Sequence, residues 1–287
     1  MTLLIVTPIH NEERNIPILA RQLTSSSVKP HLWVVVDDGS TDDGVAALKS
    51  VETDVRMVIL ERENQGGLIG GSAFSAWQFG VDRGLQMIDH ITHVMKLDAD
   101  VELSSTYLET ALSSFDTHET AGLTGGVLAD RSDREQTVHV PGPVKLYSKR
   151  GYDALQGVPR VVGFDVMDEI ALSNAGMDVI VRRDLPFSVR RPIGASQGRI
   201  HGRKRNGKVC RWTGYWTPYF FLHVARYAFR KPYIVGAAAM VAGYVAADPG
   251  PYDAGLKFAH AQSQKRKLRR ALQSPRTWFN EMYGIAK

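Results

Sequence analysis

Short apolar runs alternate with helix-like segments through the first two-thirds of the chain, and this alternation constrains the fold more than any other feature. Five runs have the length and composition of buried strands, at residues 3–6, 32–36, 55–60, 93–97 and 121–127. Amphipathic segments lie between some of them, each after a residue suited to capping a helix, at 15–23, 44–49 and 106–114. The pattern predicts an α/β protein with a mostly parallel sheet flanked by helices.

The distribution of charge divides the chain into two parts. Residues 201–287 carry 16 Lys and Arg against three acids, a net charge of +13, whereas the remainder carries −8. We expect residues 1–210 to form the α/β domain and residues 211–287 to form a helical, basic and aromatic extension. Cys210 is the single cysteine, and no signal-peptide hydrophobic region follows Met1, so a cytoplasmic location without disulfides is expected.

Polar and acidic residues follow three of the apolar runs. Open α/β sheets bind ligands beyond the carboxyl ends of their strands. The first run leads into TPIHNE at 7–12, the second into DDGSTD at 37–42 and the fourth into DAD at 98–100. Each segment alone also fits a capped turn without a ligand. Acids gathered on one sheet edge would repel one another, however, and this favours a bound cation or a polyhydroxyl ligand.

Asp98 and Asp100 are the strongest candidates for metal ligands. Alternate residues of an extended segment point to the same side, so the two carboxylates converge. Such a pair of oxygen donors suits Mg²⁺ or Mn²⁺, which would bridge the two phosphates of a nucleotide diphosphate. A turn before the next helix, capped by the same two residues, is the competing interpretation.

Three segments together resemble a known family. The sequences VTPIHNEE (6–13), VVDDGSTD (35–42) and KLDAD (96–100) look like the three successive signatures of family 2 inverting glycosyltransferases, in the family's order and spacing. The resemblance covers about residues 2–182 and implies a GT-A type catalytic domain with a Rossmann-like sheet. It also implies that Pro8, Glu12 and Asp38 line the nucleoside pocket, with Asp37 near the base or ribose.

The resemblance extends to the metal and the diphosphate. It implies that Asp98 lies at the sugar-ribose edge and shares the metal with Asp100. His201 would complete the metal shell as a late His does in some GT-A enzymes, although a histidine outside any motif is more often a surface or packing residue. Arg203, in the basic segment 199–208, is expected to contact a phosphate unless that segment is simply solvated.

A glycine-rich loop follows the third apolar run. Asn64 and Gly66 belong to the segment NQGGLIGG at 64–71. It is not a dinucleotide fingerprint, because no G-x-G-x-x-G is present. In the resembling family a comparable loop borders the nucleotide, which makes both residues candidate contacts, whereas a helix-entry loop without a ligand is the alternative.

Inversion at an anomeric carbon needs a base that removes the proton of the acceptor hydroxyl. The segment GFDVMDEI at 163–170 resembles the family stretch in which an acid at a helix start has this role. Asp168 is the predicted base, and Glu169 and Asp165 remain open. Acids placed there only to suit the helix dipole are the structural alternative.

The extension combines apolar, aromatic and basic residues. Two uncharged stretches, 212–225 and 232–247, are shorter than the roughly 20 residues that a membrane-spanning helix needs. Aromatic residues beside Lys and Arg favour peripheral contact with a membrane surface. A helical pair packed on the catalytic domain or on another subunit fits as well, and nucleic-acid binding is disfavoured because no recognisable module is present.

These observations predict a metal-dependent inverting glycosyltransferase. The donor would be a nucleotide diphosphate-sugar, most commonly of UDP, with GDP and dTDP as alternatives. The acceptor would be a glycan or a lipid-linked molecule, in the synthesis of cell-surface polysaccharide or glycolipid. A non-catalytic nucleotide- or carbohydrate-binding protein of the same fold is the second hypothesis. A nucleotidyltransferase is disfavoured, because the Gly-rich, Arg-containing loop of such enzymes is missing after residues 3–6.

Overall fold

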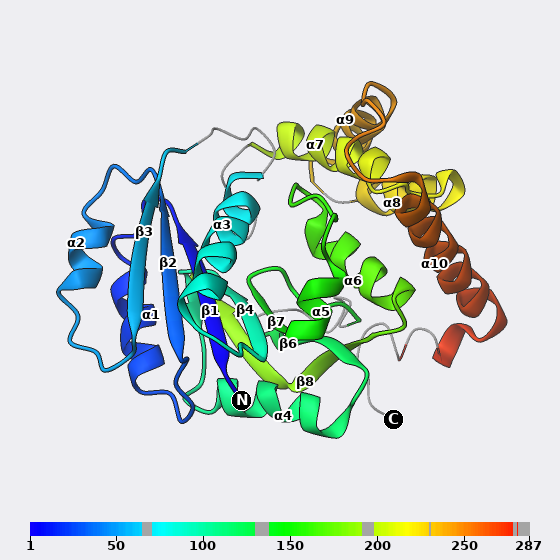
Figure 1. Ribbon diagram of the computed structural model, residues 1–287. Helices are drawn as coiled ribbons and strands as arrows, with labels where there is room; N and C mark the ends of the chain where they lie inside the picture. Colours follow the sequence, from blue (N-terminus) through cyan, green and yellow to red (C-terminus); the bar gives the residue numbers. More distant parts are fainter. Residues whose placement is uncertain (65–70, 130–137, 191–197, 230, 278–279, 281–287) are drawn as a thin grey trace.

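The computed structural model describes residues 1–64, 71–129, 138–190, 198–229, 231–277 and 280. It confirms the α/β class: an eight-stranded sheet lies between two groups of helices, and further helices pack at one end of the molecule (Figure 1). The strands are β1 (Leu3–Ile9), β2 (Leu32–Asp38), β3 (Met57–Arg62), β4 (His93–Leu97), β5 (Val101–Glu102), β6 (Ala121–Leu128), β7 (Val144–Ser148) and β8 (Asp178–Val189). The helices are α1 (Ile16–Thr24), α2 (Gly44–Lys49), α3 (Gly71–Met87), α4 (Tyr107–Thr117), α5 (Lys149–Ala154), α6 (Phe164–Asn174), α7 (Arg199–Trp212), α8 (Thr217–Ala228), α9 (Tyr233–Val245) and α10 (Ala254–Gln273).

Helices cover both faces of the sheet. In β1, Leu3 and Ile5 pack with residues of α1, α2 and α4, whereas Leu4 and Val6 pack with residues of α3, α5 and α6. All four side chains are at most 1% exposed. Successive strand residues point to opposite sides, so a strand that is covered on both faces needs an unbroken apolar run, and that run is what the sequence displays.

The sheet is mixed. Its strand order is β3-β2-β1-β4-β7-β6-β8-β5, and the first four strands of this order are parallel. β7 is antiparallel to both β4 and β6. β6 is parallel to β8, so four of the seven strand pairings are parallel, and the antiparallel ones all involve β5 or β7. The sequence did not indicate β7 and β8, because Lys145 interrupts the first and Arg182, Arg183 and Asp184 interrupt the second.

The parallel half brings the strand ends together. In the register, Ile9 of β1 pairs with Asp37 of β2, and Asp38 pairs with Arg62 of β3. The loops that follow β1, β2 and β3 consequently leave the sheet at the same edge, which Figure 1 shows at the top. This edge is the one where the sequence predicts a ligand.

The expected helix caps are not formed. Asn15, Asp43 and Thr106 precede α1, α2 and α4, but none of their side chains caps the helix with a hydrogen bond. Asn15 donates instead to the carboxylate of Glu12, at 2.8 Å. These helices are stabilised mainly by their buried apolar faces, as is usual in globular proteins.

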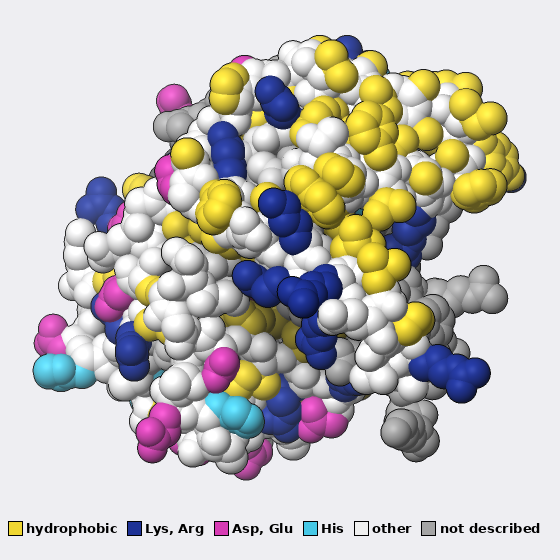
Figure 2. All heavy atoms as spheres, turned by 90° about the vertical axis from the view of Figure 1, so that its right-hand side faces the viewer, with side chains coloured by type: hydrophobic (Ala, Val, Ile, Leu, Met, Phe, Trp, Pro, Cys, Tyr) yellow, Lys and Arg dark blue, Asp and Glu magenta, His cyan; other side chains and the backbone are white. Residues whose placement is uncertain are grey.

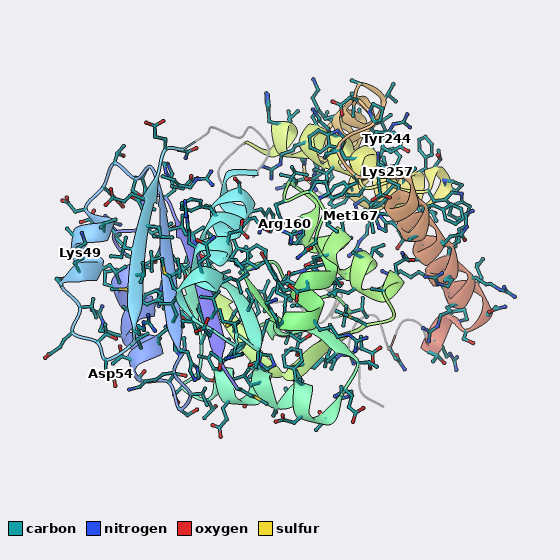
Figure 3. The ribbon with its side chains drawn as sticks, in the orientation of Figure 1. Lys49, Asp54, Arg160, Met167, Tyr244 and Lys257 are labelled. Atoms are coloured by element: carbon teal, nitrogen blue, oxygen red, sulfur yellow. The ribbon has the colours of Figure 1, made fainter. Side chains whose placement is uncertain are left out.

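The C-terminal helices form a second packed unit, and the expected helical extension is confirmed. The expected division at residue 210 falls inside α7, where Cys210 packs with Phe220 of α8 and Met240 of α9. α10 returns to the sheet domain, and Met167 of α6 is buried in a cluster with Trp212 and Tyr252 and with Leu256 of α10 (Figure 3). No described helix has both the length and the apolar character needed to cross a membrane.

Two glycines let α7 and α9 approach closely. A Cβ atom at Gly207 would lie 1.9 Å from the carbonyl oxygen of Met240, and one at Gly243 would lie 1.9 Å from that of Lys204. Both distances are far inside van der Waals contact. The two helices can pack at this distance only because neither position has a side chain.

We predict that Gly207→Ala lowers the free energy of unfolding by about 1–3 kcal/mol, because the added methyl group would push α7 from α9. Gly202→Ala in the same helix is the matched control, since a Cβ there meets no atom within 4 Å. The control should be neutral or stabilising by up to about 1 kcal/mol. Urea denaturation measures both, and equal values would contradict the close packing.

Candidate active site

The loops after β1 and β2 are joined by hydrogen bonds. The ring Nδ1 of His10 lies 2.9 Å from the carbonyl oxygen of Asp38. The backbone N–H of Asn11 donates to Ser40 Oγ at 3.0 Å, and the side-chain oxygen of Asn11 accepts from the backbone of Thr41 at 2.8 Å. The two predicted strand-end segments therefore form one surface, which is held in place by hydrogen bonds within the protein.

Asp37 and Asp38 have different surroundings. Asp38 is 3% exposed and forms an ion pair with Arg62, with 2.7 Å between Oδ1 and Nε. Burial raises the pKa of Asp38, and the positive charge of Arg62 opposes this shift. Asp37 is half-buried and accepts a hydrogen bond from the backbone of Ser40 at 3.0 Å. Of the two, Asp37 is the more accessible to a ligand.

Pro8 and Glu12 lie where β1 ends. Pro8 is half-buried and pairs with Val36 across the sheet. Glu12 is 8% exposed, and its carboxylate accepts the hydrogen bond from Asn15. The backbone next to Glu12 is fixed as well, because the N–H of Glu13 donates to the side chain of Asp42 at 2.8 Å.

Asn64 follows β3 and joins the same surface. Its side-chain nitrogen lies 3.4 Å from the ring of His10. Gly39 has a φ of +71°, and a Cβ there would lie 3.1 Å from the Cβ of Asn64. Glycine at 39 thus permits both the left-handed backbone and the close approach of the third loop. Gly66, predicted to contact the nucleotide, lies outside the described residues.

A lysine accompanies the predicted metal ligands. Lys96, 3% exposed, forms an ion pair with Asp98 and donates to the carbonyl oxygen of Gly142 at 3.0 Å. The side chain of Asp98 is 32% exposed. Lys96 holds the Asp98 carboxylate at the end of β4 while leaving part of it open to a ligand.

Asp98 and Asp100 lie close enough to influence each other. Burial raises the pKa of Asp100, and the neighbouring charge of Asp98 raises it further. Among the described residues, no cluster of three or more His, Cys, Asp or Glu could hold a metal. Mg²⁺ is usually bound through one or two carboxylates and takes its remaining ligands from water and substrate phosphates.

Asp165 lies beside this group, in the first turn of α6. One oxygen of its half-buried carboxylate is 3.6 Å from an ideal Cβ position on Gly142, the residue that accepts from Lys96. None of the described residues donates a hydrogen bond to this carboxylate. The antiparallel insertion of β7 next to β4 thus brings the start of α6 close to Asp98.

Asp168, the predicted base, is 0% exposed. Its Oδ2 accepts from Lys145 at 2.7 Å and from Tyr147 at 2.6 Å, and its Oδ1 accepts from the backbone of Glu169 at 2.7 Å. A base must offer an oxygen that the acceptor hydroxyl can reach. The prediction that Asp168 is this base is therefore corrected: its carboxylate is enclosed and serves as the partner of a buried cation.

Lys145 is fully buried with Asp168. Burial lowers the pKa of Lys145, but the carboxylates of Asp168, Glu169 and Asp165 outweigh this effect and raise it overall, so the ammonium group stays charged. Lys145 also donates to the backbone carbonyl of Asp165 at 2.7 Å. The pair thereby fixes the first turn of α6 to β7.

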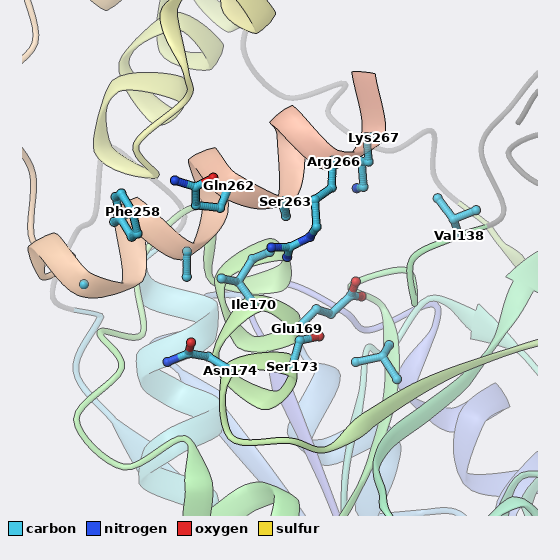
Figure 4. Close-up of a pocket in the computed structure, with 13 residues that line it drawn as sticks. Val138, Glu169, Ile170, Ser173, Asn174, Phe258, Gln262, Ser263, Arg266 and Lys267 are labelled. Atoms are coloured by element: carbon cyan, nitrogen blue, oxygen red, sulfur yellow. The ribbon is translucent and has the colours of Figure 1, made fainter. Parts of the chain in front are cut away.

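Glu169, the other candidate base, accepts from the backbone of Val140 at 2.8 Å. It faces a separate pocket of about 570 Å³ between α6 and α10, which Arg266 and Lys267 also line (Figure 4). Asp98, Asp100 and Asp165 are not part of that lining. Of the three acids considered, Asp165 is the one that lies next to the strand-end surface.

The two basic candidates lie on α7. His201 is exposed, and its role as a metal ligand stays a prediction. The guanidinium carbon of Arg203 lies 3.9 Å from the centre of the Tyr227 ring, so Arg203 packs on α8. Its contact with a phosphate likewise stays a prediction.

Sequence reasoning missed the cations that organise this edge. Arg62, Lys96 and Lys145 hold Asp38, Asp98 and the start of α6, respectively. Their signal was a positive charge at the end of an apolar strand or within one. Lysine is almost never fully buried without a partner, so a lysine in a buried strand predicts a nearby carboxylate.

The family model described as glycosyl transferase family 2 matches residues 4–165, more than half of the chain. A search of curated proteins gave no match.

Several solved structures are similar in fold. The mannosyltransferase PcManGT from Pyrobaculum calidifontis, in complex with GDP-Man and Mn²⁺, is 21% identical; the match covers 97% of this chain and 83% of that one, with a TM-score of 0.58. Glucosyl-3-phosphoglycerate synthase from Mycobacterium tuberculosis, with Mn²⁺, UDP and phosphoglyceric acid, is 17% identical over 73% and 77% (TM-score 0.54). S. aureus TarS 1-349 is 16% identical over 98% and 79% (TM-score 0.53).

We predict that Asp168→Asn lowers the free energy of unfolding by about 3–5 kcal/mol, because Lys145 would remain as a buried charge without its partner. Lys145→Met combined with Asp168→Leu should recover much of this loss, since it removes both charges. Asp153→Asn is the control: it breaks the partly exposed pair with Lys149, which water screens, and should cost less than about 1 kcal/mol. Similar losses for Asp168→Asn and Asp153→Asn would contradict a buried pair.

Proposed function

Since this chain belongs to glycosyl transferase family 2 and is a glycosyltransferase with the GT-A fold, we propose that it is a metal-dependent enzyme that transfers a sugar from a nucleotide diphosphate-sugar with inversion. One observation carries this proposal. The interlocked loops after β1, β2 and β3 share a sheet edge with Asp98 at the end of β4, and Asp165 lies next to it.

The nucleoside would lie on the interlocked loops. Pro8 and Glu12 would form its floor, Asp37 would reach the base or ribose, and Asp38 would hold the loop through Arg62. Asn64 would border the nucleotide. UDP is the first expectation, with GDP or dTDP as alternatives, and two of the similar structures named above contain GDP-Man and UDP, respectively.

Asp98 and Asp100 would hold Mg²⁺ or Mn²⁺ with the donor diphosphate. The metal would neutralise the charge that develops as the nucleotide diphosphate leaves. Lys96 would keep the Asp98 carboxylate aimed at this position. His201 is a candidate for a further ligand and Arg203 for a phosphate contact.

Asp165 would be the general base. Its carboxylate would accept the proton of the acceptor hydroxyl as that oxygen attacks the anomeric carbon from the face opposite the leaving group. Lys145, paired with Asp168, would fix the position of Asp165 through its hydrogen bond to the Asp165 backbone carbonyl. The acceptor would be a glycan or a lipid-linked molecule, in cell-surface polysaccharide or glycolipid synthesis at the cytoplasmic face of the membrane.

The metal site predicts that Mn²⁺ strengthens nucleotide binding and that Asp98→Ala removes this effect. Loss of even an outer-sphere partner lowers metal affinity about 10-fold to 100-fold, so loss of a ligand should cost at least as much. Calorimetric titration with UDP and with GDP, with and without Mn²⁺, measures the effect. Asp54→Ala, an exposed acid on the opposite side of the molecule (Figure 3), is the control. If Mn²⁺ had no effect on the binding of either nucleotide to the wild type, the metal site would be ruled out.

The assignment of the base predicts that Asp165→Asn lowers kcat by about 10²-fold to 10⁴-fold. Mn²⁺-dependent nucleotide binding should stay at the wild-type value and stability should change little, because Asp165 forms no ion pair with any residue that the structure describes. Hydrolysis or transfer from a panel of UDP-, GDP- and dTDP-sugars gives kcat, with Asp153→Asn as a surface control. Wild-type turnover by Asp165→Asn would exclude it as the base.

A further inference from the structure

Helix α9 is apolar on every side, yet one of its sides is exposed to solvent. Residues 233–247 contain no charged side chain. The side of α9 that includes Gly236, Met240 and Gly243 is buried against α7 and α8. Ile234 is nevertheless 75% exposed and Val245 is 76% exposed. A helix without a polar face normally lies inside a protein or in lipid, so the open side of α9 calls for a covering partner.

Helix α8 and its end extend this open side. Phe229 is 85% exposed, and Phe221 and Leu222 are 55% and 53% exposed. Figure 2 shows hydrophobic side chains gathered over the C-terminal helices, with Lys and Arg side chains beside them. We call this surface the α8–α9 face; its large exposed members are Phe221, Leu222, Phe229, Tyr233, Ile234, Val235 and Val245.

The charges within the face are of one sign, and the nearest acid in sequence, Asp248, follows α9 and pairs with Lys208. Residues 185–247 contain no Asp or Glu, and α10 contains none either. Arg226 and Lys231 are exposed and adjacent in sequence to members of the face. A second copy placed symmetrically on this face would bring these cations against their own counterparts, which is unfavourable. A negatively charged surface would instead attract them.

The length of α9 determines how the helix can bind such a surface. With 13 residues it is about 20 Å long, short of the roughly 30 Å hydrocarbon layer of a bilayer. Exposed aromatic and aliphatic side chains next to Lys and Arg are typical of helices that lie in the interface between headgroups and acyl chains.

We propose that the α8–α9 face docks onto an anionic lipid bilayer, with Phe221, Phe229 and Ile234 entering the acyl boundary and Arg226 and Lys231 meeting the headgroups. The carboxyl ends of β1, β2 and β3 and helices α7 to α9 lie at the same end of the molecule (Figure 1). If the proposed transfer reaction holds, docking brings the donor site to an acceptor that is carried in the membrane.

The test is co-sedimentation of the full chain with vesicles, without nucleotide. The wild type should bind vesicles of phosphatidylcholine and phosphatidylglycerol, bind phosphatidylcholine alone more weakly, and lose affinity as salt rises. Phe229→Ser combined with Ile234→Ser should weaken binding to the anionic vesicles by about tenfold or more. Leu272→Ser is the matched control, because Leu272 is as exposed as Ile234, at 75%, but lies near the end of α10; its binding should not change.

A charge-reversal variant and a matched control test the role of the basic residues. Arg226→Glu combined with Lys231→Glu should weaken binding to the anionic vesicles about tenfold or more. Lys49→Glu, an exposed change on α2 at the far side of the molecule (Figure 3), should leave binding unchanged.

Two results would overturn the proposal. One is equal vesicle binding by the wild type and the Phe229→Ser/Ile234→Ser variant, including no binding by either. The other is a wild-type dimer in sedimentation velocity that this variant dissolves while vesicles are not bound, which would assign the face to a second copy. Mn²⁺-dependent UDP or GDP binding by the same variant keeps the two questions apart, since it reports on the donor site without lipid.

Discussion

The ion pair between Lys145 and Asp168 joins two layers of the molecule at the point where the site is built. Lys145 belongs to β7 and Asp168 to α6, and neither side chain is exposed. Burying two charges is costly, and here hydrogen bonds from Tyr147 and from the backbone of Glu169 complete the shell of the carboxylate. Because Lys145 also binds the carbonyl of Asp165, the pair sets where the first turn of α6 lies relative to the sheet.

A second set of hydrogen bonds and ion pairs fixes the other side of the site, at the ends of β1 to β4. Hydrogen bonds link the loops after β1 and β2 through His10 and Asn11, and Asn64 adds the loop after β3. Lys96 binds both Asp98 and the carbonyl of Gly142, and Gly142 lies next to Asp165 in the first turn of α6. A preorganised polar surface costs little rearrangement when a charged ligand arrives, and this suits a phosphate-bearing donor.

Much of this arrangement could be predicted from sequence, and the failures have physical causes. Unbroken apolar runs identified β1, β2 and β4, because a strand covered on both faces must be apolar throughout. β7 was not predicted from the sequence, because Lys145 is typical of a surface position and its buried partner Asp168 is known only from the fold. Asp168 and Asp165 both suit a helix start, and only the fold separates the enclosed acid from the one beside Gly142. Spacing along a chain does not report which side of a helix faces a cavity.

Crystals of the wild type with Mn²⁺ and UDP, measured at a wavelength where manganese scatters anomalously, test the central claim most directly. We expect one strong anomalous peak within coordination distance of Asp98 or Asp100, with the uridine on the loop that carries Asp37 and the carboxylate of Asp165 facing the diphosphate. A peak far from these residues, or uridine bound away from the β1 and β2 loops, would contradict it.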